Sequence, residues 1–374
     1  KQGVAADRIA GTVQNDLLKE FGARGAWIFP IDPSLRLAVD VIEYCTRSLP
    51  RVNPISIASH YRDAGANPAE EAAYTLAAGV AYAQACLDRG LLVDDFLPRL
   101  SFFFYTYTNF FEEIAKYRAA RRIWSRHVRD AWGGNERAQL WRCAVVCGGH
   151  SLTKQEPLNN IARTTIETMA VAMSGVQSVF TAAYDEAFAI PTELAAKTAL
   201  RVQQIVAFET DVASTADPLA GSYFVEALTD DMEAKITRVM ATIAERGGMV
   251  ECLRSGFVQR QIGQRAYEWQ RDLEAGRRTV VGVNAFANSD PIDSVKVHRV
   301  PIEVEKEQRD RLRAIRQRRD GAAVSLALER LGVAANGRDN LMPYIRQAVL
   351  AYATIGEITS TLRRVFGTYI QVDL

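Results

Sequence analysis

The sequence predicts an α/β protein that forms part of a (β/α)8 TIM barrel, with about five strand–helix units followed by a helical extension. The main observation is a set of β-rich runs that recur about every 40 residues, around 10–14, 54–59, 100–107, 140–147 and 177–183. Amphipathic helical stretches separate them, at 33–48, 69–89, 109–132 and 157–173. Strands that alternate with helices form a parallel sheet, and apolar runs such as Phe102-Phe103-Phe104 are typical of strands covered on both faces.

A doubly wound open sheet is the first alternative. Such a sheet usually carries a glycine-rich turn after its first strand, and no G-x-G-x-x-G occurs here. A barrel needs eight units, whereas five are visible. We therefore expect three further strands, either ahead of Lys1 or from another chain.

The elements follow in order along three regions. Residues 1–190 are expected to be the C-terminal part of a barrel, whose first strand leads into a short helix at 17–21. Proline-containing pairs mark later helix starts, such as Asn67-Pro68 and Glu156-Pro157. Residues 191–285 should pack on the barrel as helices at 191–210, 227–246, 249–255 and 258–275, with one more strand at 280–283. Residues 286–374 should hold a linker and a subunit-contact region, with one charged helix at 303–332 and one or two short helices at 340–366.

Composition narrows the class of partner. The net charge of +1 gives no support to nucleic-acid binding, and no run of about 18 uncharged apolar residues is present, so no membrane span is expected. The five cysteines are scattered and odd in number, which argues against a disulfide framework and favours a reducing cytoplasm. No metal site is expected, because Cys143, Cys147 and His150 are too few for zinc.

Reactive groups of a parallel barrel lie at the carboxyl ends of its strands. That rule selects residues 14–15, 59–60, 105–109, 147–150 and 178–181. His60 is the natural acid–base group of this set: it could donate a hydrogen bond to a carbonyl oxygen or move a proton near neutral pH. It could equally be a histidine held by neighbouring backbone. Three arginines flank strands and would suit phosphate or carboxylate, although each alone is typical of a surface residue: Arg24, Arg51 and Arg99.

Six blocks in the same order resemble the large, substrate-binding subunit of cobalamin-dependent acyl-CoA mutases, the methylmalonyl-CoA mutase family. The blocks are Gly11-Thr12-Val13-Gln14-Asn15-Asp16, Pro98-Arg99-Leu100-Ser101-Phe102-Phe103, Asn159-Asn160-Ile161-Ala162-Arg163-Thr164, Tyr184-Asp185-Glu186-Ala187, Ala216-Asp217-Pro218-Leu219-Ala220-Gly221-Ser222-Tyr223 and Val281-Gly282-Val283-Asn284. In that family an acyl-CoA threads the barrel and adenosylcobalamin caps its carboxyl mouth.

The resemblance implies a role for each matching residue. Gln14 and His60 would be catalytic and hold the thioester, with His60 on its carbonyl and Thr12 and Val13 touching the same end. Arg24 would meet the acyl group and Arg51 would contact CoA. A further CoA contact matches Arg99, Leu100 and Ser101, and the cofactor face would include Glu186 and Gln177.

The cofactor face departs from the family pattern. Where the family has His-Cys-Gln-Thr-Ser-Gly-Trp, this chain has Ala144-Val145-Val146-Cys147-Gly148-Gly149-His150, and Phe180 and Ala182 replace a histidine and an asparagine. Ala58-Ser59 stand where Ser-Gly-Tyr would precede His60. No D-x-H-x-x-G cobalamin-ligand motif is present, so a separate small subunit would bring adenosylcobalamin.

Three hypotheses follow from this resemblance with departures. The first is an isomerase that rearranges the carbon skeleton of an acyl-CoA, with adenosylcobalamin on a partner subunit. The second is a cobalamin-independent enzyme, such as a decarboxylase or epimerase, that uses His60 as acid or base. The third is a non-catalytic homologue that retains the CoA site.

Overall fold

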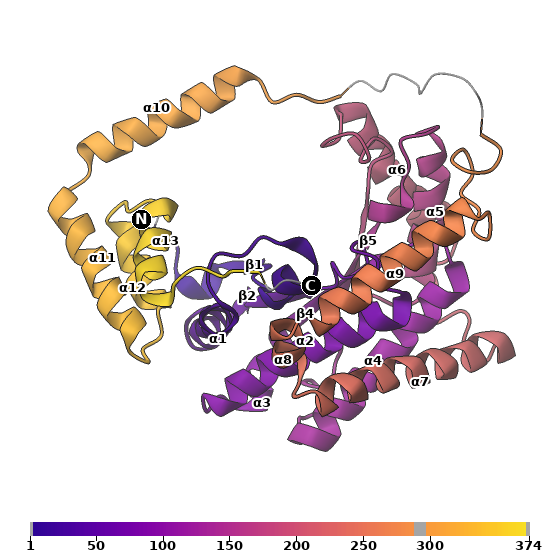
Figure 1. Cartoon of the computed structure of the whole chain (residues 1–374), viewed down its shortest axis with the longest axis horizontal. Coiled ribbons are helices and arrows are strands. Elements are labelled where there is room, and N and C mark those ends of the chain that lie inside the picture. The colour runs from indigo at the N-terminus through magenta and orange to yellow at the C-terminus, as the bar shows by residue number, and fades with distance from the viewer. Residues whose placement is uncertain (1–2, 288–296, 372–374) are drawn as a thin grey trace.

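The computed structural model describes residues 3–287 and 297–371 and shows an arc of parallel strands flanked by helices (Figure 1). A four-stranded parallel sheet has the order β3 (Ile55–Ala58), β4 (Leu100–Thr106), β5 (Cys143–Cys147), β6 (Ser178–Thr181). A two-stranded parallel sheet pairs β1 (Ala10–Thr12) with β2 (Arg51–Asn53). Only Pro54 separates β2 from β3, and proline has no N–H with which to continue a ladder. The strands therefore follow one another in chain order, as in part of an α/β barrel.

Each strand run is followed by a helix that packs on the same side of the sheet. These helices are α1 (Ile31–Ser48), α2 (Pro68–Asp88), α4 (Phe110–Trp132), α5 (Asn159–Met173) and α6 (Glu193–Glu209), with a short α3 (Val93–Phe96) before β4. The start of α2 is a capping box, in which Asn67 Oδ1 accepts from the Glu70 N–H at 2.9 Å and Glu70 Oε2 accepts from the Asn67 N–H at 3.2 Å. The expected helices of this half are confirmed to within a few residues.

The main core lies between the strands and these helices. Alternate strand residues are buried in it, among them Ile55, Ile57, Phe102, Phe104 and Val145. Successive side chains of a strand point to opposite faces, so the residues between them face away from the helices. We call these the inner-face residues: Ser56, Ala58, Ser101, Phe103, Tyr105, Ala144, Val146, Ser178 and Phe180.

The strand register arranges these inner-face residues in rows. Ser56 pairs with Ser101 near the amino end. The next row joins Ala58, Phe103, Ala144 and Ser178, and the row nearest the carboxyl end joins Tyr105, Val146 and Phe180. Most side chains of the first two rows are small. TIM barrels usually fill this space with bulky branched side chains, whereas small side chains predominate in these two rows.

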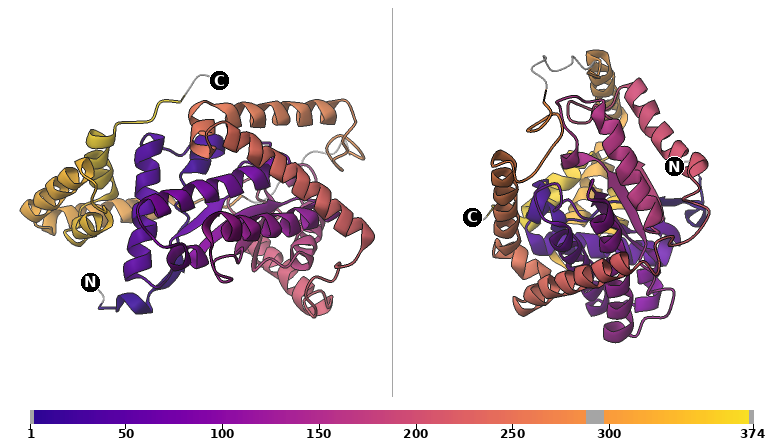
Figure 2. Two further views of the ribbon diagram at one scale, coloured as in Figure 1. Left: turned by 90° about the horizontal axis from the view of Figure 1, so that it is seen from below. Right: turned by 90° about the vertical axis from the view of Figure 1, so that its right-hand side faces the viewer.

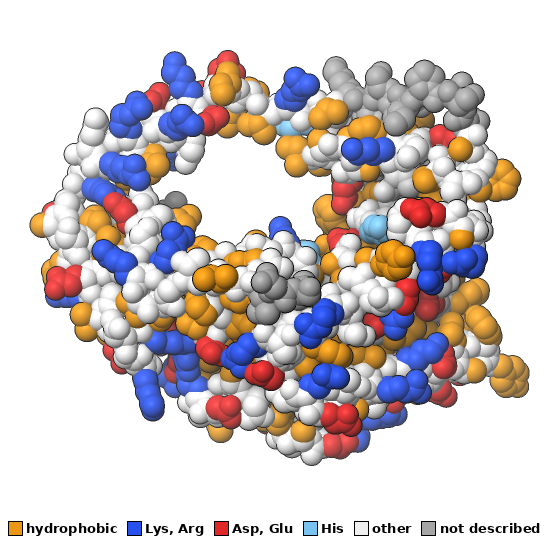
Figure 3. All heavy atoms as spheres, viewed as in Figure 1, with side chains coloured by type: hydrophobic (Ala, Val, Ile, Leu, Met, Phe, Trp, Pro, Cys, Tyr) orange, Lys and Arg blue, Asp and Glu red, His pale blue; other side chains and the backbone are white. Residues whose placement is uncertain are grey.

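Two further groups of helices complete the described residues. The helices α7 (Tyr223–Glu245), α8 (Met249–Arg254) and α9 (Phe257–Glu274) lie outside the first layer, and α7 runs along α4 and α2 (Figure 2). The last group comprises α10 (Ile302–Arg318), α11 (Gly321–Asn336), α12 (Met342–Leu350) and α13 (Ile355–Phe366). Its own small core, which includes Leu331, Leu341 and Leu362, also takes in Phe29 ahead of α1. Figure 3 shows an opening between α10 and the strand-bearing part, and no α10 residue is buried.

Some sequence predictions for the second half were wrong. The single helix expected at 303–332 is two helices, because Asp320 accepts from the Ala322 and Ala323 N–H groups at 2.9 and 3.1 Å and starts α11 anew. The strand expected at 280–283 is only an isolated bridge between Val281 and Ala285. The short helix expected at 17–21 is present from Leu18, but it continues as a π-helix over Glu20–Arg24. Residues 288–296 of the expected linker lie outside the described residues.

Other predictions concern absences. None of the described helices is long and apolar enough to cross a membrane. Within residues 3–287 and 297–371, no three His, Cys, Asp or Glu side chains lie close enough to hold a metal ion. All five cysteines are buried free thiols.

Candidate active site at the carboxyl ends of the strands

The loop after β1 is held against the end of β3 by a buried carboxylate. Asp16 is 1% exposed, and its Oδ2 accepts from the Ala58 N–H at 2.8 Å. Its Oδ1 accepts from the Tyr82 hydroxyl at 2.7 Å and from the Leu18 N–H at 3.1 Å. Burial raises the pKa of Asp16, against the hydrogen bonds and the Lys19 charge that lower it. This one side chain therefore fixes the end of β1 next to the residues that lead to His60.

Gln14 lies at the tip of that loop and is exposed. Its Oε1 accepts from Lys19 Nζ at 3.1 Å, which leaves the amide nitrogen to donate to a ligand. Asn15, the next residue, has both side-chain polar atoms buried without a hydrogen-bond partner in the protein. Such atoms in a native site are commonly paired by water or a ligand.

His60 follows β3 directly and is half-buried, with its ring edge-on to Tyr105 at a centroid distance of 5.5 Å. Burial, together with the positive charges of Lys19 and Arg24, lowers the pKa of His60 to about 3. The imidazole is therefore neutral near pH 7, and its Nδ1 has no hydrogen-bond partner among the described residues. A neutral imidazole can donate one hydrogen bond, but a group with so low a pKa is a poor proton acceptor at neutral pH.

An acidic group lies on the other side of the strand ends. The Tyr107 hydroxyl donates to Asp63, which also accepts from the His150 N–H at 3.1 Å. Burial, and then the negative charges of Asp63 and Asp185, raise the pKa of Glu186 to about 7. Glu186 is partly enclosed at its carboxyl group but exposed as a whole residue, so a ligand can still reach it.

The ends of β5 and β6, which the sequence predicts to face a cofactor, pack tightly against each other. Gly148 has a φ of 128°, and a Cβ there would lie 2.3 Å from the Ala182 Cβ. The Ala182 N–H donates to the Cys147 carbonyl at 2.8 Å, so β6 continues to pair with β5 in this region. Phe180, in the row of inner-face residues nearest the carboxyl end, is 58% exposed. This side of the mouth is therefore apolar and lacks room for larger polar side chains.

The remaining predicted residues lie at both ends of the strands. Arg24 is exposed at the carboxyl end, 3.9 Å from Glu20, whereas Arg51 is exposed at the start of β2. Thr12 Oγ1 accepts from Asn53 Nδ2 at 2.8 Å, and the neighbouring Val13 is 41% exposed.

Arg99 lies at the amino end of β4 and is largely occupied. Its guanidinium donates to the carbonyls of Cys45 at 3.1 Å and Leu49 at 3.2 Å, at the end of α1. Leu100 is buried, and Ser101 Oγ donates to the Ile55 carbonyl at 3.1 Å. Arg51, Arg99 and Ser101 thus share the amino end of the strands.

The structure does not bring Gln177 and Glu186 together. Gln177 precedes β6 at the amino end, where its Oε1 accepts from the Cys143 N–H at 2.6 Å. Glu186 follows β6 at the carboxyl end. The two residues therefore lie on opposite ends of the strand, and only Glu186 lies near His60's end.

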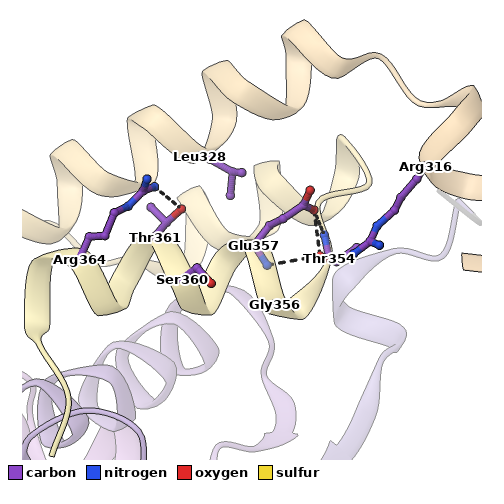
Figure 4. Close-up of a pocket in the computed structure, with 8 residues that line it drawn as sticks. All are labelled: Arg316, Leu328, Thr354, Gly356, Glu357, Ser360, Thr361 and Arg364. Carbon is purple, nitrogen blue, oxygen red and sulfur yellow. Dashed lines mark hydrogen bonds between the residues drawn. The ribbon is translucent and has the colours of Figure 1, made fainter. Parts of the chain in front are cut away.

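Three residues of the mouth were missed in the sequence: Asp16, Lys19 and Asp63. Asp16 could have been found, because an acid directly after a strand-end block is placed to cap the following turn. Asp63 carries no comparable signal. A pocket in the C-terminal helices, lined by Arg316, Thr354, Glu357 and Arg364 among others, lies between α10, α11 and α13 and contains none of these residues (Figure 4).

Comparison with known proteins gives consistent matches over nearly the whole chain. The family model described as methylmalonyl-CoA mutase matches residues 1–368. The chain is 40% identical to the 2-hydroxyisobutanoyl-CoA mutase large subunit of Aquincola tertiaricarbonis, over 99% of this chain and 66% of that protein. It is 40% identical to the methylmalonyl-CoA mutase of Rhizobium meliloti, over 100% of this chain and 52% of that protein. It is 39% identical to the methylmalonyl-CoA mutase of Escherichia coli, over 99% of this chain and 52% of that protein. The chain thus spans about half to two thirds of the length of these relatives.

Proposed function

Because the chain belongs to the methylmalonyl-CoA mutase family, we propose that it forms the substrate-binding part of an acyl-CoA mutase. Such an enzyme is an isomerase that moves a group between adjacent carbons of an acyl-CoA. The observation that carries the proposal is the inner face, where small side chains run between two polar ends. One end presents His60 and Gln14, and the other presents Arg51, Arg99 and Ser101.

This arrangement suits a long ligand with different chemistry at each end. The extended pantetheine arm of CoA would lie along the inner face, over the partly exposed Ser101 and Ala144, whereas Ser56 and Ala58 are buried beneath it. The nucleotide phosphates would lie at the amino end near Arg51, because an exposed guanidinium pairs well with phosphate. Arg99 contributes mainly by holding the end of α1 in place.

We also propose that the arc closes into an eight-stranded barrel. Among the described residues β1 pairs only with β2 and β6 only with β5, so both outer strands have an unpaired edge. Sheet edges of this kind are normally covered or paired. Three further strand–helix units, from the same polypeptide or a partner, would pair with β1 and β6 and enclose the inner face.

At the mouth, the residues of this chain would bind and orient the thioester. Neutral His60 donates a hydrogen bond to the thioester carbonyl, and the Gln14 amide donates from the neighbouring loop. Arg24, exposed beside them, would meet a polar or charged acyl group. The apolar wall of Val146 and Phe180 excludes water from the reacting carbons.

Adenosylcobalamin is the cofactor that the resemblance implies, and the mouth fits it in part. Glu186 offers a carboxyl group, Asn15 has unpartnered polar atoms, and Phe180 offers an exposed apolar surface for a large macrocycle. These residues would hold the cofactor, which supplies radical chemistry when bound. The name of one relative includes the words large subunit, so we propose a small partner subunit that carries the cofactor.

The cobalamin-independent alternative finds no support. A decarboxylase or epimerase that used His60 as a base would need a pKa near the working pH, whereas burial lowers this pKa to about 3. Nor do the relatives named above include such an enzyme.

The test combines the protein with candidate small subunits, adenosylcobalamin, and either methylmalonyl-CoA or 2-hydroxyisobutanoyl-CoA. We expect corrin absorbance to comigrate with the complex and an isomeric acyl-CoA to appear. His60→Ala should reduce turnover by about 100-fold or more. CoA esters that stabilise the protein without any turnover would instead favour a non-catalytic homologue. No stabilisation by any CoA ester would refute the proposal.

A further inference from the structure

A network of four charged side chains is buried between α2 and α4, directly behind the strand ends. The side chains of Glu71, Glu113 and Lys116 are 0% exposed. Lys116 Nζ lies 2.7 Å from Glu71 Oε2 and 2.5 Å from Glu113 Oε2, and Arg62 donates to Glu113 Oε1 at 3.2 Å. Two positive and two negative charges balance. Even balanced charges are costly to bury, so a gain in stability is a weak explanation for such a network.

The network holds the backbone of β4 and the residue before His60. Glu71 Oε1 accepts from the Ser59 hydroxyl at 2.7 Å and from the Tyr105 N–H at 3.0 Å. Lys116 Nζ donates to the Tyr105 carbonyl at 2.7 Å. The backbone N–H and carbonyl of Tyr105 and the side chain of Ser59 therefore all bond to one buried ion pair, and the Tyr117 hydroxyl also donates to the Tyr105 carbonyl at 2.8 Å.

Two residues that the network holds, Ser59 and Tyr105, are direct neighbours of the candidate catalytic His60. Ser59 directly precedes His60 in the chain, and the His60 ring packs edge-on against the Tyr105 ring. One carboxylate oxygen thus joins the chain segments that carry the two rings, in addition to the backbone hydrogen bond from the Ser59 N–H to the Phe103 carbonyl. Because hydrogen-bond strength falls steeply with angle, a small rotation of His60 would misdirect its donor N–H.

We propose that Ser59, Glu71 and Lys116 are positioning residues that aim the His60 imidazole at the thioester carbonyl. The inference rests on the proposed function, in which His60 donates that hydrogen bond. The network itself touches no substrate. Because it links α2, α4 and Ser59, the network holds the His60 ring in one orientation relative to these helices.

Ser59→Ala tests this with a minimal change. It removes one hydroxyl, while the Ser59 N–H still donates to the Phe103 carbonyl at 2.8 Å, so the strand pairing remains. The matched control is Ser34→Ala, which also removes a buried hydroxyl; the Ser34 hydroxyl donates to the backbone carbonyl of Phe29 at 3.2 Å. Ser34 lies in the first turn of α1, and its partner Phe29 packs in the core of the C-terminal helices.

Two readouts separate positioning from general stability. The first is the ring signal of His60 in the NMR spectrum of histidine-labelled protein, which has only four histidines to resolve and is assigned with His60→Gln. The second is the separation of kcat from KM in the complex with the small subunit. We expect Ser59→Ala to shift or broaden the His60 signal and to lower kcat about 10-fold, with KM changed less than about two-fold.

Ser34→Ala should change neither readout. The proposal is overturned if the His60 signal of Ser59→Ala coincides with that of the wild type, or if Ser34→Ala shifts it equally. It is also overturned if KM rises while kcat is unchanged. Absence of turnover in the wild-type complex would refute the proposed function alone, because the NMR signal still reports how His60 is held.

Discussion

Blocking the inner face is the sharpest way to perturb the proposed acyl-CoA site. Ala144 lies in the second row of inner-face residues, in register with Phe103 on one side and Ser178 on the other. In Ala144→Phe a phenyl ring would project between these positions, into the path of the pantetheine arm. The flanking Cys143 and Val145 point into the helical core and would be undisturbed. The change should therefore block the ligand without unpacking the protein.

The size of the effect follows from ligand linkage. A ligand at 100 times its Kd stabilises the folded state by about 2.7 kcal/mol. For a protein larger than 250 residues, each kcal/mol shifts Tm by about 2 °C, so the wild type should gain about 5 °C. In Ala144→Phe, a Kd weakened at least 100-fold would reduce that gain to about 1 °C or less.

The assay is a thermal scan with and without an acyl-CoA, with free CoA and pantetheine as comparison ligands. Ala144→Ser is the control, because it keeps a small side chain in the row and should retain the full shift. Far-UV circular dichroism shows whether the phenylalanine variant is folded before ligand is added. A folded Ala144→Phe protein with a wild-type shift would refute the assignment of the inner face to CoA.

Four other perturbations have defined outcomes. Asp16→Ala should lose about 3–5 kcal/mol in urea unfolding, because it leaves the Ala58 N–H and other buried donors unpaired; a loss below about 1 kcal/mol would contradict this role. Lys116→Met should lose about 3–5 kcal/mol, since it leaves buried carboxylates without their cation, and an unchanged midpoint would contradict the ion network. The pKa of His60 is about 3 in the folded state and about 6.5 in the unfolded state. Unfolding in acid therefore takes up a proton that the native ring does not hold. The free energy of unfolding falls as the pH drops from 6.5 toward 3. His60→Gln should reduce that loss between pH 7 and 5 by about 1–2 kcal/mol, whereas a His60 NMR signal that titrates near pH 6.5 would contradict the low pKa. Asp63→Asn should lower the pKa of Glu186 from about 7, as followed by carbon NMR of labelled glutamate, and an unchanged value would show that Asp63 has little influence on it.

The order of strands and helices in the first half could be predicted because each signal was local. Apolar runs flanked by helix starts, such as Asn67-Pro68 before α2, define their elements within a few residues of chain. The break between α10 and α11 was missed, because Arg319 and Asp320 sit within a continuous charged pattern. There the Asp320 cap outweighs the periodicity, and Arg319 is turned aside to pair with Glu357 of α13. Such a long-range contact leaves no trace in a local pattern.

The candidate site was predictable where it follows strand ends and unpredictable where it depends on burial. The places of His60 and Gln14 after strand ends were predicted from position alone, and their roles stay a prediction. The low pKa of His60, which favours a hydrogen-bond donor over a proton carrier, depends on burial and on the charges of Lys19 and Arg24. The network around Glu71 joins residues that are tens of positions apart in sequence, so only the folded chain brings it together. Gln177, named from a motif, proved to lie at the other end of its strand from Glu186.

The most direct test of the central claim is an experimental structure of the protein, with any strands that complete it, bound to a non-reactive acyl-CoA analogue. We expect the pantetheine arm to lie against Ser101 and Ala144, with the thioester carbonyl within about 3 Å of a His60 ring nitrogen. A CoA bound on the outer helices, or an inner face filled by side chains while His60 contacts only protein, would contradict the account.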